Sequence, residues 1–409
     1  MPNSFNYAEK WQTDLLGIIT DETLTSPFIV SNVNWLSAKT FHFTQKSVSG
    51  FKNHARSGGW NSGTITDTDK PYTVAHDRDI QFLVDKADVD ETNTTASIQN
   101  TSNVFVRTQQ APETDAHFYE RVAQAALANA KVENVALSTW SADNVVSRLK
   151  ALFKNCKKYK SQAGGLIAYL KTEIMDYLSV AKEFTRNITV QNVGVNGTSV
   201  QTRITDLDGV TLIEILDDDR FYSQFDYSDG FDAADIAQAI NVLVASPLQV
   251  KTVPKISSIY YFNAGTHTEG DGDLYQHRAF WDTFVFPNGK DGEIDCIYVS
   301  LEPNALFTTT ITSAYGGGAN KSTITITSTQ LDASTAYGTT YWYKAHATEV
   351  AAPTVYSDAT TAGYTKMTLT EAAQTFTFAA ETKIRVAEVD AYGRIIGVSA
   401  ETTIVKTGT

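Results

Sequence analysis

The sequence predicts an α+β protein with mostly antiparallel sheet, followed by an all-β domain at the C-terminus. Three segments between residues 112 and 184 place apolar residues at helical spacing. From residue 187 the chain changes to short β-type runs bounded by Asn, Gly, Asp and Pro, without the regular strand–helix alternation that builds a parallel sheet. After residue 303 the composition shifts to Thr, Ser, Ala and Tyr, and no helical stripe remains.

The first 85 residues are expected to form an arm and a long hairpin. Residues 1–38 lack a sustained period, and their aromatic side chains must pack on the body of the chain or on a neighbouring subunit: Trp11, Phe28 and Trp35. Residues 39–85 alternate at both ends and are rich in turn residues between 51 and 71. A two-stranded hairpin is marginal by itself in water, so we expect a neighbour to support this one.

Helix signals mark three starts. Pro112 suits the first helical position, and Glu113 and Asp115 suit the positive end of the helix. Ser141 and Thr172 are expected to cap the second and third helices, and Gly164–Gly165 breaks the chain between them. The apolar stripes of these helices are Phe118, Val122, Ala125 and Ala126; Val145, Val146, Leu149, Leu152 and Phe153; and Ile174, Leu178, Ala181 and Phe184.

Strand candidates fill the rest of the chain. ITVQNVGV, VTLIEIL, INVLVAS, ISSIYYF, RAFWDTFVF and IDCIYVS precede residue 303. Residues 305–409 contain short β runs at intervals of 8–12 residues, a pattern typical of a small sandwich. A length of about 100 residues matches an immunoglobulin-like domain. Residues 390–393 (DAYG) are interpreted as the tight turn of its last hairpin.

Composition excludes several classes of protein. The net charge is −13 and the pI is near 5.0, so binding DNA through phosphates is not expected to be the main function. Cys156 and Cys296 have no partner at metal-site spacing and indicate a reducing compartment. Neither a signal peptide nor a membrane span is expected. The 20 Phe, 19 Tyr and 6 Trp, with only 19% charged residues, fit burial against neighbours, and a well-packed monomer fits them nearly as well.

The sequence offers few candidates for chemistry. We expect no catalytic residue, no cofactor and no metal site, because the seven histidines lack metal-ligand spacing and no nucleophile motif is present. Asp217–Asp219, with Asp206, Asp208 and Glu214 nearby, could bind a hard cation, but a solvated loop is favoured. The basic run Arg148–Lys160 could contact DNA or acidic loops of a neighbouring subunit; a favourable helix end explains it more simply.

Two pairs of segments resemble the major capsid proteins of tailed bacteriophages. Residues 78–92 (RDIQFLVDKADVDET) and 112–119 (PETDAHFY) are similar to a strand with an acidic end and the helix start that follows it in those proteins. Residues 278–286 (RAFWDTFVF) and 294–300 (IDCIYVS) are similar to their final strand pair. The resemblance spans residues 39–302, and bacterial encapsulin compartments share this shell fold.

The resemblance implies a role for each segment. Residues 1–38 would be the N-terminal arm, 39–85 the extended hairpin loop over a neighbouring subunit, and 86–304 the peripheral and axial domains, with a spine helix from Glu113. Residues 305–409 would be an accessory sandwich on the outer surface, dispensable for assembly. The chain would form hexamers and pentamers of an icosahedral virion shell, built in the host bacterial cytoplasm. The shell would enclose double-stranded DNA without sequence-specific binding.

Further expectations concern partners. Portal and scaffolding proteins are expected, the latter as separate chains, and no membrane contact is expected. Related capsids can form isopeptide cross-links from a hairpin lysine, but no motif assigns one to Lys46, Lys52 or Lys70, and we predict none. Two alternatives stay open: an encapsulin-type compartment, or a virion surface or tail-associated protein that binds carbohydrate through Tyr341, Trp342 and Tyr343. Alternation would place Trp342 on the opposite face from both tyrosines.

Overall fold

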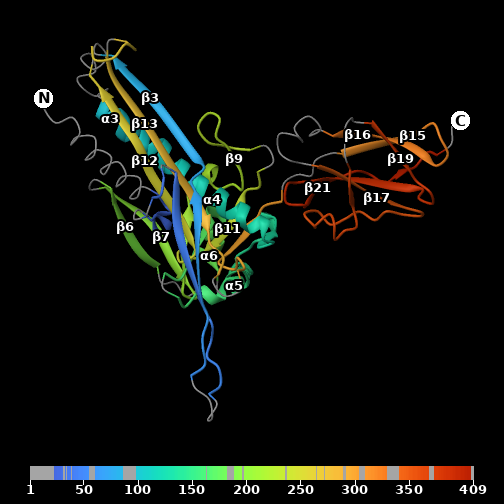
Figure 1. Cartoon of the computed structure of the whole chain (residues 1–409), viewed down its shortest axis with the longest axis horizontal. Coiled ribbons are helices and arrows are strands. Elements are labelled where there is room, and N and C mark those ends of the chain that lie inside the picture. The colour runs from blue at the N-terminus through green and yellow to red at the C-terminus, as the bar shows by residue number, and fades with distance from the viewer. Residues whose placement is uncertain are drawn as a thin grey trace. The chain divides into compact units, whose positions relative to one another are not determined.

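The computed structural model divides the chain into two compact units, Met1–Glu302 and Pro303–Thr409. Figure 1 shows both, and each is described by itself. The structure describes residues 23–30, 33, 35–37, 39–54, 60–85, 98–162, 164–181, 188–195, 198–234, 237–263, 265–270, 272–288, 292–303, 309–328, 340–367 and 373–406. No helix among these residues is both long and apolar enough to cross a membrane.

A mixed seven-stranded sheet forms the centre of unit 1. Only the pairs β14–β4 and β5–β8 are parallel, so the expected antiparallel character is confirmed. The two innermost strands, β11 and β5, are buried along almost their whole length, as expected for strands covered on both faces. The order is β4 (Val132–Asn134), β14 (Ile297–Leu301), β11 (Ile240–Ala245), β5 (Leu166–Lys171), β8 (Val210–Ile215), β7 (Thr198–Leu207) and β6 (Ile188–Val195).

Three helices pack on this sheet: α4 (Ala111–Ala128), α5 (Val145–Asn155) and α6 (Thr172–Val180). The apolar stripes expected for them lie in one core, and Phe28 of the short helix η1 (Ser26–Phe28) joins it. The ring of Phe28 lies 4.7 Å from that of Phe118 and 6.2 Å from that of Tyr169. Segment 23–30 of the expected arm is therefore part of the body. Trp11 and Phe184 lie outside the described residues.

Three helix starts differ from expectation. Thr172 is the first residue of α6 rather than its cap; Lys171 holds the N-cap position, and the Thr172 hydroxyl donates to the Ile215 carbonyl at 2.7 Å. The long helix begins before Pro112, with α3 (Ile98–Phe105) and the π turn η2 (Val106–Gln110) running directly into α4. Proline is tolerated there because the π turn already interrupts the regular hydrogen-bond ladder. Helix α5 begins four residues after Ser141, with Asn144 at the N-cap position. The Oδ1 atom of Asn144 accepts a hydrogen bond from the Ser141 amide at 3.0 Å.

A second sheet of unit 1 is long and three-stranded, and a separate hairpin precedes it. The sheet order is β12 (Val250–Phe262), β13 (Gly272–Val285) and β3 (His76–Asp85), while β1 (Thr40–Val48) pairs with β2 (Ile65–Thr73). The expectation of one hairpin whose second strand is 72–85 was wrong. Residues 65–71 are strand rather than tip, and β3 leaves the hairpin at the buried Val74. The Ala75 amide donates to Asp282 of β13, which redirects the chain.

Short elements complete unit 1. They are the 3-10 helices η3 (Leu137–Thr139), η4 (Lys157–Tyr159) and η5 (Asp218–Arg220), and the two-stranded pair β9 (Phe225–Asp226) and β10 (Asp232–Ala233). Gly164 and Gly165 both have positive φ angles, +87° and +59°. They form the break expected before β5, at a conformation that favours glycine.

Unit 2 consists of two sheets that share a core. One contains β15 (Thr309–Tyr315), β16 (Lys321–Ser328) and β19 (Ala373–Thr377); the other contains β18 (Thr365–Lys366), β17 (Thr340–His346), β20 (Lys383–Val389), β21 (Ile395–Val398) and β22 (Thr402–Thr403). Ile324 and Ile326 of the first sheet pack with Tyr341 and Val386 of the second. The expected turn is present at 390–393, where the Gly393 amide donates to the Asp390 carbonyl.

Candidate assembly surface

The far end of the β1–β2 hairpin exposes large apolar side chains. Phe51 and Trp60 are fully exposed, at 110% and 98%, and Val48 and Ile65 are exposed at 71% and 75%. The hairpin extends away from the rest of unit 1 in Figure 1. Val48 and Ile65 are directly opposite each other in the strand pair, and exposed apolar groups gathered at one end of an element mark an interaction surface in a folded protein. We call Val48, Phe51, Trp60 and Ile65 the hairpin tip.

Polar contacts order the backbone behind this tip. The Ser49 amide donates to the Thr64 carbonyl at 2.9 Å, and the Thr64 amide donates to the Ser49 hydroxyl at 2.8 Å. Lys52 Nζ donates to the Ser62 carbonyl at 2.9 Å. These hydrogen bonds already restrict the hairpin backbone in the free subunit, so less conformational entropy is lost when a partner binds.

The base of the hairpin is anchored in unit 1. Phe41 is 1% exposed, and its ring meets that of Phe284 at 5.2 Å. Tyr72 contacts the rings of Phe284 and Phe286 at 5.5 and 5.1 Å. Trp35 packs edge-on against Phe41, 5.7 Å away. One end of the hairpin is thus held by aromatic packing, while the other end presents its apolar groups to solvent.

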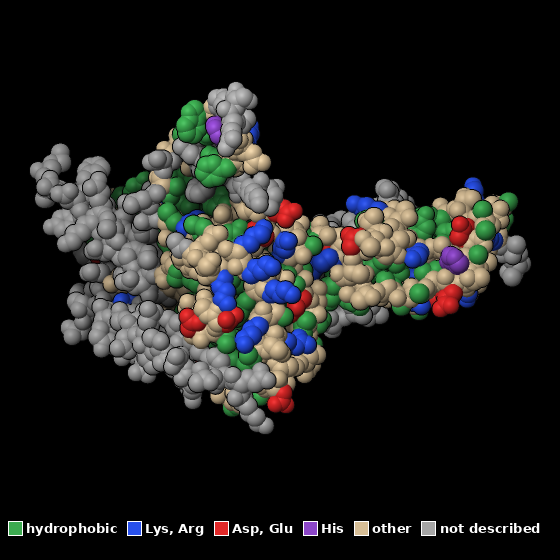
Figure 2. All heavy atoms as spheres, turned by 90° about the horizontal axis from the view of Figure 1, so that it is seen from below, with side chains coloured by type: hydrophobic (Ala, Val, Ile, Leu, Met, Phe, Trp, Pro, Cys, Tyr) green, Lys and Arg blue, Asp and Glu red, His purple; other side chains and the backbone are tan. Residues whose placement is uncertain are grey.

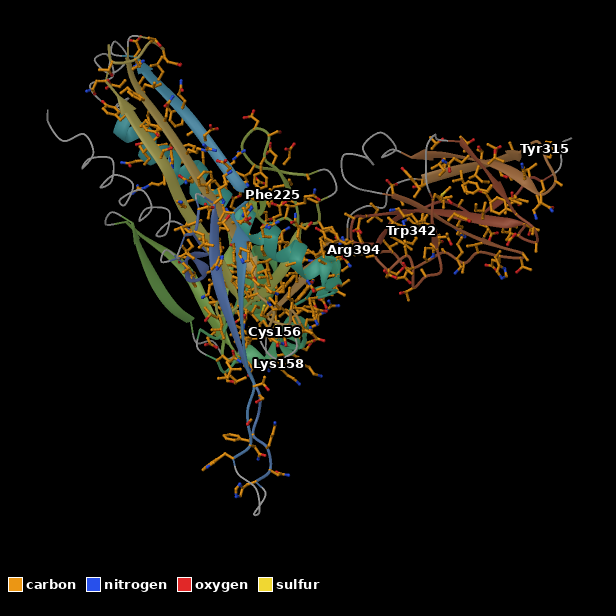
Figure 3. The ribbon with its side chains drawn as sticks, viewed as in Figure 1. Cys156, Lys158, Phe225, Tyr315, Trp342 and Arg394 are labelled. Carbon is orange, nitrogen blue, oxygen red and sulfur yellow. The ribbon has the colours of Figure 1, made fainter. Side chains whose placement is uncertain are left out.

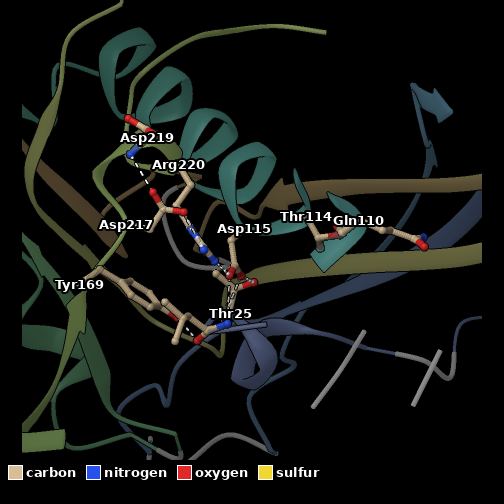
Figure 4. Close-up of polar contacts among 9 residues, drawn as sticks. Thr25, Gln110, Thr114, Asp115, Tyr169, Asp217, Asp219 and Arg220 are labelled. Carbon is tan, nitrogen blue, oxygen red and sulfur yellow. Dashed lines mark hydrogen bonds and ion pairs between the residues drawn. The ribbon is translucent and has the colours of Figure 1, made fainter. Parts of the chain in front are cut away.

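A buried carboxylate ties the arm segment to α4 (Figure 4). Asp115 is fully buried and accepts hydrogen bonds from the Leu24 and Thr25 amides at 3.1 Å and from the Thr25 hydroxyl at 2.8 Å. Arg220 lies 3.4 Å from the same carboxylate and also binds Asp217 at 2.8 Å. Burial raises the pKa of Asp115, and the Arg220 charge and the Thr25 hydrogen bonds oppose that rise.

A second polar network joins α4 to the start of β3 and to β13. Glu113 binds His76 at 3.1 Å and Arg78 at 2.8 Å, and Asp282 binds Arg121 at 3.0 Å. The ring of His117 packs against that of His76 at a tilted angle, with 4.4 Å between ring centroids. Burial, with the nearby His76 and Arg121 charges, holds the pKa of His117 well below its usual value. The root of the hairpin is therefore fixed to the long helix by several charged contacts.

Two of the three carboxylates in the acidic run at 217–219 pair with cations of the same chain. Asp217 accepts the Asp219 amide and pairs with Arg220, and Asp218 lies 3.3 Å from Lys171. Asp206 accepts the Gly209 amide in a turn, and Asp208 pairs with Lys160. Among the described residues, no cluster of His, Cys, Asp and Glu could hold a metal ion. These carboxylates instead stabilise turns and bind cationic side chains.

The basic run Arg148–Lys160 divides into paired and unpaired side chains. Lys158 binds Asp295, and Lys160 binds Asp208. Arg148 lies over the ring of Trp140 at 5.3 Å. Figure 2 looks at unit 1 from the end where Figure 1 shows α5, and Lys and Arg side chains gather on that face.

The two cysteines are buried in unit 1. Cys156 and Cys296 are 1% and 0% exposed, and burial raises the pKa of each thiol to about 12. Both thiols therefore stay protonated and unreactive near neutral pH. Figure 3 shows Cys156 beside the labelled Lys158 at the lower end of unit 1.

The aromatic triplet 341–343 does not form one exposed patch. Tyr341 is 2% exposed and lies in the core between the two sheets, with Tyr343 packed against it from the same face. Trp342 lies on the other face of β17 and packs with Ala359 and Tyr364, so the expected alternation is confirmed. The carbohydrate hypothesis consequently loses the surface on which it was based.

No pattern in the sequence indicates that the hairpin tip is apolar or that Asp115 is a buried hydrogen-bond acceptor. Residues 51–71 were expected to be a polar tip, and the isolated Phe51 and Trp60 within it gave no periodic signal. Asp115 was expected to suit a helix N-terminus, whereas it lies inside a continuous helix as a buried acceptor. Lys52 is exposed on the hairpin, and the side chain of Lys46 lies outside the described part of the chain.

Comparisons with known proteins give similarities in structure only. No family model matches the sequence, and no curated protein matches it. A structure of Mycobacterium phage Che8 is 15% identical, covering 68% of this chain and 90% of that chain, with a TM-score of 0.42. The capsid structure of the cyanophage P-SCSP1u is 12% identical, covering 68% and 87%, with a TM-score of 0.46.

A virus-like particle from Pyrococcus furiosus is also similar. It is 12% identical, covering 72% of this chain and 99% of that chain, with a TM-score of 0.36. Each of these similarities spans 68–72% of this chain.

Proposed function

We propose that this chain is the major capsid protein of a tailed phage, forming hexamers and pentamers of an icosahedral shell around double-stranded DNA. The observation that carries the proposal is the hairpin tip. Its fully exposed Phe51 and Trp60 sit on a hairpin whose base is anchored in the core of unit 1. Burying such aromatic groups against a neighbour is the main favourable term of most protein association.

We propose a role for each of three parts of the chain. Residues 39–85 hold the hairpin and its root, and 86–304 hold the long helix and the central sheet. Residues 305–409 are proposed to be an immunoglobulin-like accessory domain on the outer surface. The two-sheet core of unit 2 supports this proposal. Portal and scaffolding proteins are proposed as further partners.

Electron microscopy of the purified chain tests the proposal. We expect closed shells in negative stain, with or without a co-expressed scaffolding protein. The double variant Phe51→Ser/Trp60→Ser should fold like the parent, because the two side chains are fully exposed in the subunit, but it should sediment as subunits. The control Val180→Ser removes an apolar side chain that is 67% exposed on α6 and should still assemble. Normal shells from the double variant would contradict the role of the hairpin tip.

Truncation tests the accessory role of unit 2. A chain ending at Glu302 should fold and assemble, because unit 1 has its own core. A truncated chain that is insoluble or unfolded would refute the division. Nuclease-resistant DNA in particles recovered from the producing cells would favour a phage shell, and DNA-free particles that enclose protein cargo would favour a compartment of the encapsulin type.

A further inference from the structure

We propose that a basic face on α5 binds an acidic loop on a second copy of this chain, joining copies head to tail. The basic face consists of Lys150, Lys154 and Lys157, and the acidic loop of Asp226, Asp229 and Asp232. The inference rests on the self-assembly proposed above and names the residues of one contact in it. It is independent of the hairpin tip, because it concerns different elements and charged rather than apolar groups.

The basic face concentrates positive charge in an acidic chain. Residues 148–160 contain six Lys or Arg and no Asp or Glu, although the whole chain carries −13. Lys150 and Lys154 lie one helical turn apart, Lys157 follows in η4, and all three are exposed. Like charges at this spacing repel each other. The face therefore holds an unfavourable charge density that an anionic partner would relieve.

Acids near this face are already used by other lysines. Lys160 binds Asp208, whose pKa is lowered by Lys160 and to a lesser extent by Lys150. Lys158 binds Asp295. Within the described part of the chain, Lys150, Lys154 and Lys157 take part in no ion pair. Three cations consequently remain for a partner.

The acidic loop holds the opposite charge in an equally unfavourable arrangement. Asp226 of β9 and Asp232 of β10 are directly opposite each other in the antiparallel pair, and both are exposed. Like charges directly opposite each other destabilise a strand pair. Asp229 is exposed in the connection between them. Asp226 accepts the Ser228 amide at 3.0 Å, but in the described ranges these three carboxylates form no ion pair.

The loop is held in place despite this repulsion. Arg78 donates to the carbonyls of Tyr227 and Gly230. Glu120 accepts the Phe225 amide at 3.1 Å and the Tyr227 hydroxyl at 2.6 Å. Figure 3 labels Phe225 near the start of β3. A buried partner on α4 and a half-buried partner on β3 thus present the three acids on a fixed scaffold, which reduces the entropy lost on binding.

The position of the two patches makes the contact heterologous. Figure 1 shows α5 and β9 well apart within unit 1. Each copy can therefore offer its basic face to one neighbour and its acidic loop to another, and contacts of this kind generate a ring or a continuing array. Three cations facing three anions also match in number. Proteins that hold duplex DNA by charge commonly make about 6–10 phosphate contacts, so a second copy fits this small face better than DNA does.

Charge reversal tests the contact. The variants are Lys150→Glu/Lys154→Glu/Lys157→Glu, Asp226→Lys/Asp229→Lys/Asp232→Lys, and the combination of all six changes. Assembly is measured by sedimentation velocity and negative-stain microscopy against protein concentration, with thermal unfolding to confirm that each variant folds. Each triple variant should need about tenfold or more protein to assemble. The combined variant should assemble at close to the parental concentration, because the charges are exchanged rather than lost.

The outcomes separate this inference from the proposed function. Loss of assembly in both triple variants with recovery in the combined variant supports the contact. Normal assembly of either triple variant, or failure of the combined variant to recover, overturns it while leaving the shell proposal intact. A parent chain that never assembles overturns both. A basic-face variant that assembles normally but loses affinity for a 30-base-pair DNA duplex would show that the face binds nucleic acid, and would also overturn the contact.

Discussion

Replacing Asp115 with alanine should lower the free energy of unfolding of unit 1 by about 3–5 kcal/mol. The carboxylate is 0% exposed and is the acceptor for the Leu24 and Thr25 amides and the Thr25 hydroxyl. Each buried donor left without an acceptor costs about 1–3 kcal/mol. Arg220 would lose one of its two carboxylate partners but would keep Asp217.

Urea unfolding of the unassembled subunit, followed by tryptophan fluorescence, measures this loss. All Trp residues except Trp342 lie in unit 1, so the signal reports mainly on that unit. Asp115→Asn keeps one acceptor oxygen and should cost clearly less than Asp115→Ala. The control Asp219→Ala removes an exposed carboxylate and should change stability by less than about 0.5 kcal/mol. A loss below about 1 kcal/mol for Asp115→Ala would refute the view that this carboxylate fastens the arm segment to α4.

Three further changes test the packing and the electrostatics. Phe28→Ala should cost about 3–5 kcal/mol, since its ring is fully buried; a parental urea midpoint would show that the arm segment is not part of the core. Burial lowers the pKa of His277 to about 4 from 6.5, so the unfolded state binds this proton first and stability should fall by about 3 kcal/mol as the pH drops through that window. His277→Phe should remove that part of the acid loss, and an unchanged pH profile by chemical unfolding would contradict it. Gly393→Ala should destabilise unit 2 by about 1 kcal/mol because its φ is +82°; an unchanged transition of the Trp342 signal would contradict that reason.

Local patterns predicted most elements of unit 1. The apolar stripes of α4, α5 and α6 face the core as their spacing indicated, and the strand candidates at 188–195, 210–216 and 240–246 form β6, β8 and β11. Boundaries failed where two signals competed. Pro112 is a helix-start signal, yet the helix continues through it because a π turn lies just before it. Alternation along 72–85 gave no sign that the chain changes sheets at Val74.

The candidate surfaces were less predictable. The run 217–219 resembles an open acidic site in sequence, but Arg220 at its end pairs with Asp217, and the fold brings Lys171 of β5 to Asp218. The acids of the β9–β10 loop are spaced three residues apart, and this spacing by itself predicts no shared surface. Pairing of the two strands places Asp226 and Asp232 side by side, which is a property of register and not of composition.

The sequence by itself determined the mixed helix and sheet content, the change of composition near residue 303, and the core faces of the helices, because each depends on periodicity or propensity along the chain. Tertiary structure alone decided which strands pair, which carboxylates find a cation, and which aromatic groups stay exposed. Phe28 and Phe51 illustrate the reason: both are isolated aromatic residues in irregular sequence, yet one is fully buried and the other is 110% exposed. Burial depends on what the rest of the chain brings alongside, and no local pattern carries that information.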